Sequence, residues 1–173
     1  MDVYKAIYKR CSTRSFDETR DVSLELVNKI LEAACQAPSA GDVQPWRFWV
    51  VRNPQLKDKL TTAAINQQFI AEAPVVIIVC SNLDVCGEAY GTRGRELYAI
   101  QDAAAATENI LLAACSEGLG VCWVGAFYED NVAELLDLPK NLKPLAIIPL
   151  GYPVRKNVKP SRMPIEDVVE YLD

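Results

Sequence analysis

The sequence has 173 residues, of which 50% are hydrophobic and 24% charged, a balance typical of one globular domain with a sizeable core. Its net charge of −5 argues against nonspecific binding to nucleic acid, which needs a basic surface. No apolar run is long enough to span a bilayer, and the start of the chain lacks the basic-then-apolar pattern of a signal peptide. We therefore expect a cytoplasmic protein without a membrane partner, folded as a single domain over residues 1–173.

The composition also argues against metal chemistry and against histidine chemistry. The six cysteines include no CxxC pair, whereas zinc and iron–sulfur sites usually show close pairs, and the chain contains no histidine. A catalytic triad based on histidine is therefore excluded. We expect no metal site and no catalytic side chain, and we expect most of the cysteines to be buried free thiols.

The first half of the chain predicts helices and strands in alternation. A short helix is expected over residues 2–9, and a second, with apolar residues every three to four positions, begins after Ser23. A strand over 48–51 precedes a helix over 54–64, which has proline in its first turn. The continuous apolar run 75–80 predicts a central strand that is buried on both faces.

The second half is dominated by one long apolar helix. Residues 82–94 contain three glycines and little periodicity, which predicts a mobile loop. The helix expected over 95–117 is apolar on most of its surface, so either a partner subunit covers it or it is the central helix of a monomer. The remaining expected elements are a strand over 121–125, a helix over 130–136, a strand over 145–152 and a terminal helix that begins at Pro164.

A short basic segment follows the first helix. Arg10 and Arg14 are four residues apart and frame the hydroxyl groups of Ser12 and Thr13. Forked guanidinium donors together with hydroxyl donors suit a phosphate group. A solvated basic turn is the alternative, because short clusters of arginine and serine are common.

The loop 37–46 is stiff and polar. Pro38 and Pro45 restrict the backbone at its two ends, and Gly41 allows the chain to turn or to approach a ligand closely. Such a loop either holds a ligand or serves as an ordinary connection between a helix and a strand. Its remaining polar and aromatic side chains are Ser39, Asp42, Gln44 and Trp46.

Four segments together resemble the FMN-dependent nitroreductase family, over nearly the whole chain. They are Arg10–Phe16, Ala37–Trp46, Gly118–Gly125, and Gly151–Pro153 leading to Ser161–Pro164. The resemblance implies an α+β fold with a central, mostly antiparallel sheet flanked by helices, and a C-terminal extension exchanged in a homodimer.

The resemblance also implies two FMN sites at the dimer interface, each built from both chains. Within one site, the resemblance assigns the phosphate and ribityl end of FMN to Arg10, Cys11, Ser12 and Arg14, with Arg162. It assigns the loop from the other subunit to Pro38, Ser39 and Ala40, with Asp42 and Gln44 nearby. Asn66 would meet the pyrimidine edge, and the backbone of Val124 and Gly125 would face the reactive edge of the ring.

The activity implied by the resemblance is a ping-pong oxidoreductase. NAD(P)H would give a hydride to flavin N5, and a nitroaromatic, quinone or similar electron-poor acceptor would then be reduced in the same pocket. Two alternatives stay open, a relative with different flavin chemistry and a flavin carrier or sensor without turnover. Asp42 stands where the family commonly has asparagine, so its carboxylate either lowers the flavin potential or only caps the turn.

Overall fold

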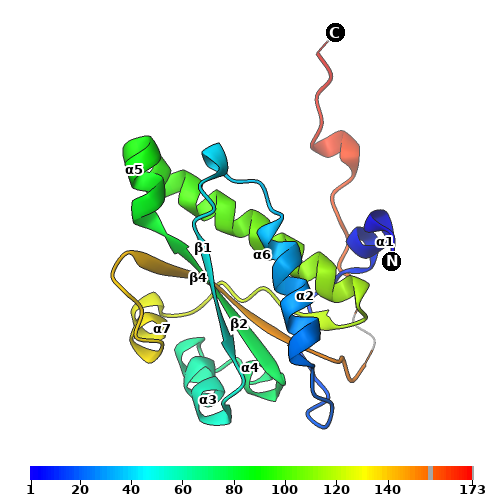
Figure 1. The fold of residues 1–173 in the computed structure, drawn as a ribbon. Coiled ribbons are helices and arrows are strands. Elements are labelled where there is room, and N and C mark those ends of the chain that lie inside the picture. The colour runs from blue at the N-terminus through cyan, green and yellow to red at the C-terminus, as the bar shows by residue number, and fades with distance from the viewer. Residues whose placement is uncertain (156–157, 173) are drawn as a thin grey trace.

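A computed structural model describes residues 1–155 and 158–172 and is organised around a four-stranded sheet (Figure 1). The strands lie in the order β1-β2-β4-β3, and every neighbouring pair is antiparallel. The sheet and its flanking helices confirm the predicted α+β fold, whereas exchange of the C-terminal extension stays a prediction. The strands are β1 (Trp46–Val51), β2 (Val75–Asn82), β3 (Gly120–Val121) and β4 (Leu142–Gly151).

Strand β2 is the centre of the core, as the apolar run predicts. Residues 75–80 are completely buried because β1 and β4 pair with its two edges and helices cover both faces. Val75, Ile77 and Val79 join one hydrophobic cluster, whereas the alternate residues Val76 and Ile78 join the other. Burial on both faces explains why the run shows no alternation of apolar and polar residues.

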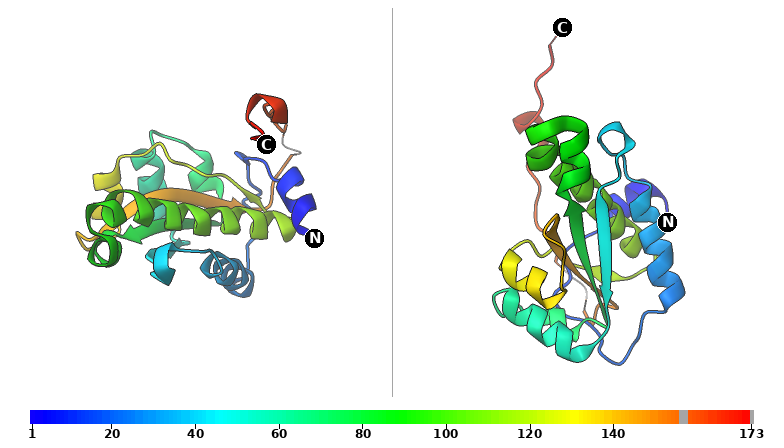
Figure 2. Two further views of the ribbon diagram at one scale, coloured as in Figure 1. Left: turned by 90° about the horizontal axis from the view of Figure 1, so that it is seen from above. Right: turned by 60° about the vertical axis from the view of Figure 1, so that its left-hand side comes forward.

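The two faces of the sheet are covered by different sets of helices (Figure 2). Helices α2 and α6 pack on one face, while α3, α4 and α7 pack on the other. The side chains of Asp2, Ser23 and Asn53 each accept a hydrogen bond from a backbone N–H in the first turn of a helix and so cap three helices. The helices are α1 (Val3–Lys9), α2 (Leu24–Cys35), α3 (Pro54–Ala63), α4 (Phe69–Glu72), α5 (Leu83–Arg93), α6 (Ala99–Ser116) and α7 (Glu129–Leu135).

The prediction of a mobile loop over 82–94 is wrong. The Asn82 side chain accepts hydrogen bonds from two backbone N–H groups and starts α5, which continues through the single π turn Gly94–Tyr98 into α6. Gly94 allows close packing, because a Cβ atom there would lie 2.0 Å from the Cys86 carbonyl oxygen. The backbone leaves helical geometry at Tyr90 and Gly91, so residues 83–98 form a helical hairpin, and Gly94 marks a tight contact within it.

The chain also departs from prediction after β3 and after β4. The strand expected over 121–125 is reduced to Gly120–Val121 and one bridge between Val124 and Ile147. The terminal helix expected from Pro164 is only the 3-10 turn Ile165–Asp167. The C-terminal segment leads away from the body of the molecule (Figure 1), so it lacks the packing that a short helix needs.

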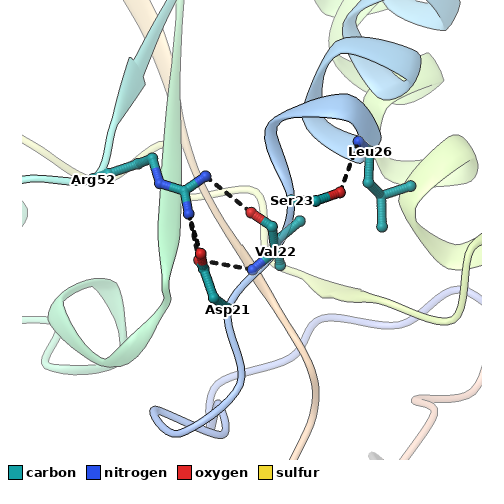
Figure 3. Close-up of polar contacts among 5 residues, drawn as sticks. All are labelled: Asp21, Val22, Ser23, Leu26 and Arg52. Atoms are coloured by element: carbon teal, nitrogen blue, oxygen red, sulfur yellow. Dashed lines mark hydrogen bonds and ion pairs between the residues drawn. The ribbon is translucent and has the colours of Figure 1, made fainter.

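Arg52 ties the start of α2 to the end of β1 (Figure 3). Its Nη1 donates to the Val22 carbonyl oxygen at 2.9 Å, and its Nη2 donates to the Asp21 carboxylate. Asp21 also accepts from the Val22 N–H at 2.8 Å, and the Ser23 hydroxyl caps the first turn of α2. Helix α2 and strand β1 flank the loop 36–45 in the sequence. The Arg52 bonds therefore join the start of α2 to the end of β1, which are the ends of these two elements farthest along the chain from the loop.

Replacing Arg52 by methionine removes both interactions and keeps an unbranched side chain. We expect the free energy of unfolding to fall by about 1 kcal/mol, because the ion pair is partly exposed and water screens it. Urea unfolding measures the change. Lys59→Met is the control, since Lys59 has no ion pair within the described residues, and an equal loss in both variants would contradict the role of Arg52.

Candidate functional site

The basic segment runs beside the edge of the sheet. The Arg10 N–H closes α1 on the Ala6 carbonyl, and Ser12 then forms a parallel bridge with Val121. The Thr13 N–H donates to the Val121 carbonyl at 2.8 Å, so the segment is extended. Side chains of an extended segment alternate between two sides, which groups Ser12 with Arg14 and separates them from their neighbours.

The two arginines of this segment differ in their partners. Arg10 Nε lies 3.7 Å from Glu108 Oε1 on α6, and burial raises the pKa of Glu108 while Arg10 lowers it. Arg14 is exposed, and its guanidinium lies 6.0 Å from the centre of the Phe69 ring on α4. Within the described residues Arg14 has no carboxylate partner. Arg14 is therefore the cation that is free to meet an anionic ligand.

A backbone donor lies next to this segment in the chain after β3. The N–H and the carbonyl of Val124 both pair with Ile147 at 3.0 Å. Of the two residues whose backbone was predicted to face the flavin ring, this leaves Gly125 to donate an N–H. Gly125 is exposed, and its N–H has no hydrogen-bond partner in the part of the chain that the structure describes. The Gln67 side chain donates to the Ala126 carbonyl at 3.1 Å and so ties the turn that carries Asn66 to the same place.

Sequence reasoning missed Gln67, although it directly follows the predicted Asn66. Asn66 is exposed and has a left-handed backbone with φ of 57°. Its turn leads into α4, which carries the Phe69 ring beside Arg14. Contacts made by their neighbours therefore place Asn66, Arg14 and Gly125 along one polar surface. Together with Arg10 and Ser12 we call it the cationic half of the site.

The second half of the site is the loop 37–44. Its backbone is left-handed at Gly41, Asp42 and Gln44, with φ of 55°, 59° and 52°. The Gln44 N–H donates to the Ser39 hydroxyl at 3.0 Å, and the Gln44 amide donates to the Asp42 carboxylate at 2.9 Å. The carboxylate of Asp42 therefore has a partner inside the loop, which favours the interpretation of Asp42 as a turn residue.

Asp102 on α6 supports this loop from below, and sequence reasoning missed it. Its Oδ1 accepts from the Ala40 N–H at 3.1 Å, and its Oδ2 accepts a weak bond from Cys86 Sγ at 3.9 Å. Burial raises the pKa of Asp102, and the Ala40 N–H opposes that rise. The available signal was a single carboxylate surrounded by alanines in an apolar helix.

The cationic half and the loop do not meet within one chain. In the described part of the chain, no hydrogen bond, ion pair or ring contact joins 37–44 to residues 10–14 or 124–126. Arg162 is also separate, since its Nη1 donates only to carbonyls of its own exposed tail, those of Pro160 and Ser161, at 3.2 Å. The structure thus gathers Arg10, Ser12, Arg14, Asn66 and Gly125, and it leaves Pro38–Gln44 and Arg162 elsewhere.

A cavity of about 240 Å³ lies between the end of α1 and the end of α6. Lys9, Arg10 and Arg155 give it a positive lining, and the thiols of Cys11 and Cys115 line its wall. Cys11 thus faces this cavity. Within residues 1–155 and 158–172, no three cysteine, aspartate or glutamate side chains are placed to hold a metal ion. In the same residues no helix is long and apolar enough to cross a membrane.

Comparison with known proteins gives one consistent family. The model of the nitroreductase family matches residues 7–68 and 61–152. A relative from Methanothermobacter thermautotrophicus is 41% identical over 159 residues, which cover 88% of this chain and 78% of the relative. A Bacillus subtilis protein named FMN reductase (NAD(P)H) is 31% identical over 96% of this chain and 72% of its own length. A solved structure of a nitroreductase family protein from Clostridium novyi NT superposes with a TM-score of 0.80 at 34% identity, over 88% of this chain and 86% of that one.

The burial of the cysteines predicts their reactivity. Cys35 is exposed and Cys11 half-buried, whereas the other four cysteines are buried, and burial raises the pKa of Cys80 to about 12. Because the thiolate is the reactive form, we expect only Cys11 and Cys35 to react quickly with a disulfide reagent in the folded protein. Counting fast thiols before and after unfolding tests this. Cys35→Ser should remove one fast thiol, and rapid reaction of the buried four would contradict the packing described.

Proposed function

Since the chain belongs to the nitroreductase family, we propose that it is an FMN-dependent oxidoreductase that uses NAD(P)H. It would reduce nitroaromatic, quinone or similar electron-poor acceptors in a ping-pong cycle. The relative named FMN reductase (NAD(P)H) supports the cofactor and the reductant. The observation on this chain that carries the proposal is the pair of available donors in the cationic half: among the described residues, Arg14 has no carboxylate partner and the Gly125 N–H has no hydrogen-bond partner.

The residues of the cationic half fit FMN chemically. Arg14, Arg10 and the Ser12 hydroxyl offer charged and neutral donors to the phosphate and ribityl end. The Gly125 N–H offers a donor to the ring, and the Asn66 amide can both donate to and accept from its pyrimidine edge. FMN, when bound, supplies the hydride chemistry, so the chain has only to bind it, orient it and shape the pocket. The lack of histidine is then no obstacle.

The site is completed by a second copy of the chain in this proposal. Helix α6 turns one stripe of residues outward, at spacings of four, and Ile100 in this stripe is 39% exposed. The C-terminal segment likewise exposes apolar side chains that a single chain does not cover. A homodimer would cover both surfaces and bring the loop 37–44 of one protomer to the cationic half of the other. The outward stripe of α6 consists of Ile100, Ala104, Glu108 and Leu112.

Reduction of the bound flavin distinguishes an enzyme from a carrier or sensor. The FMN-loaded protein should lose its visible flavin absorbance within seconds of anaerobic mixing with NADH or NADPH, and an electron-poor acceptor should restore it. Stopped-flow absorbance with each reductant separately also reports the preferred nucleotide. Absence of bleaching with both reductants would contradict the oxidoreductase proposal and favour flavin binding without turnover.

Arg14→Gln should weaken FMN binding at least about tenfold, because a charge-assisted hydrogen bond contributes roughly 1.5–3 kcal/mol. Arg14 is a cleaner target than Arg10, which also pairs with Glu108. Arg20→Gln removes the same charge at a guanidinium that lies over the Tyr152 ring, and it should leave the affinity unchanged. Fluorescence titration of the flavin-free proteins measures the three dissociation constants. Equal affinities for Arg14→Gln and the unaltered protein would remove Arg14 from the site.

A further inference from the structure

Asp102 is an unusual residue for its position. It lies on the inward face of α6 between the buried residues Ala99 and Ala103, and it is only 6% exposed. Among the described residues it is the one buried carboxylate. Removing a charged group from water is unfavourable unless the group is paired or hydrogen-bonded. The contacts of Asp102 therefore indicate why the fold keeps it.

Those contacts lead to the loop rather than to the core. Asp102 Oδ1 accepts from the N–H of Ala40 at 3.1 Å, across 62 positions of sequence. Ala40 is the first residue of the 3-10 turn Ala40–Asp42, and the first N–H groups of a helical turn have no partner within it. In the described part of the chain this is the sole hydrogen bond from residues 37–44 to an element distant in sequence. The carboxylate is thus the polar anchor of the loop.

The anchored turn needs support from outside. Gly41 and Asp42 are both left-handed, a conformation that is unfavourable for aspartate without compensating contacts. Tyr90 of α5 packs directly over Gly41, because a Cβ atom there would lie 1.9 Å from the tyrosine hydroxyl oxygen. The rings of Tyr90 and Tyr98 meet edge to face at 5.4 Å. The turn is therefore held between the helical hairpin 83–98 and the carboxylate on α6.

We propose that Asp102 is a positioning residue for the flavin site, which fixes Ala40 and its turn in the shape that a second copy of the chain presents to FMN. This inference rests on the proposed function, because it takes the loop 38–40 as the part that approaches the flavin. Asp102 does not touch the cofactor, and it acts through the Ala40 N–H. The loop would keep its internal bonds without Asp102, but its start would no longer be fixed to α6.

Two substitutions separate the oxygen acceptor from the charge. Asp102→Asn keeps an oxygen of the same shape for the Ala40 N–H, so FMN affinity should stay within about threefold of the unaltered protein. Asp102→Ala removes the acceptor, and affinity should fall by about tenfold or more. If the alanine variant is too unstable to purify, Asp102→Leu fills a similar volume without an acceptor. Hydrogen exchange of the Ala40 amide should accelerate in the alanine or leucine variant and stay slow in the asparagine variant.

Thr107→Val is the matched control on the same helix. Thr107 is buried, and within the described residues its hydroxyl donates only to the Ala103 carbonyl one turn earlier, so its loss should lower stability and leave FMN affinity unchanged. Dissociation constants and thermal unfolding of the flavin-free proteins are measured together. The inference is overturned if the alanine variant binds FMN normally, or if all variants lose affinity in proportion to their loss of stability. Failure of the unaltered protein to bind FMN would instead overturn the proposed function, and this inference with it.

Discussion

Helix α6 carries the contacts on which both halves of the site depend. On its inward face Asp102 holds the Ala40 N–H, and on its outward face Glu108 lies beside Arg10. These two residues are six positions apart, which corresponds to about 9 Å along the helix axis. The helix thus separates the loop from the cationic half within one chain and fixes each of them to the same rigid element.

The rest of the fold keeps this helix in place. Residues 75–80 of strand β2 are buried apolar residues, so the centre of the sheet offers no polar group to a ligand, and the site groups come from loops at its edges. Arg52 closes the far end of the unit formed by α2, the loop and β1, while Asp102 supports its near end. A stiff connection between two fixed ends is what a binding loop needs, because ordering it on binding would otherwise cost conformational entropy.

Local signals in the sequence predicted the features that depend on neighbouring residues. Ser23 and Asn53 cap their helices, and the apolar run 75–80 forms the central strand. The hairpin 83–98 was missed because its glycines were interpreted as mobility, whereas Gly94 allows close packing against Cys86. Such a contact depends on which backbone lies opposite, and single-sequence patterns do not contain that information.

The same limit applies to the site. Arg14, Ser12 and Gly125 were predicted from local motifs, and their role at a flavin stays a prediction. Asp102 and Gln67 were missed because each bonds a backbone group that is distant in sequence. Arg162 lies in a tail that leads away from the body, so its role stays a prediction, as does the cytoplasmic location. The carboxylate of Asp42, which the sequence left open, has a partner in Gln44.

The central claim is that each FMN site takes its cationic half from one protomer and its loop from another. Mixing two defective variants tests it directly. Arg14→Glu damages the cationic half, and Gly41→Val damages the loop, because φ is +55° there and Tyr90 occupies the space a side chain would need. Each variant alone should bind FMN poorly. After subunit exchange, the mixed dimer has one site with both parts intact, so the account predicts that FMN binding reappears in the mixture. A mixture that forms mixed dimers and binds no more FMN than its two components would contradict it.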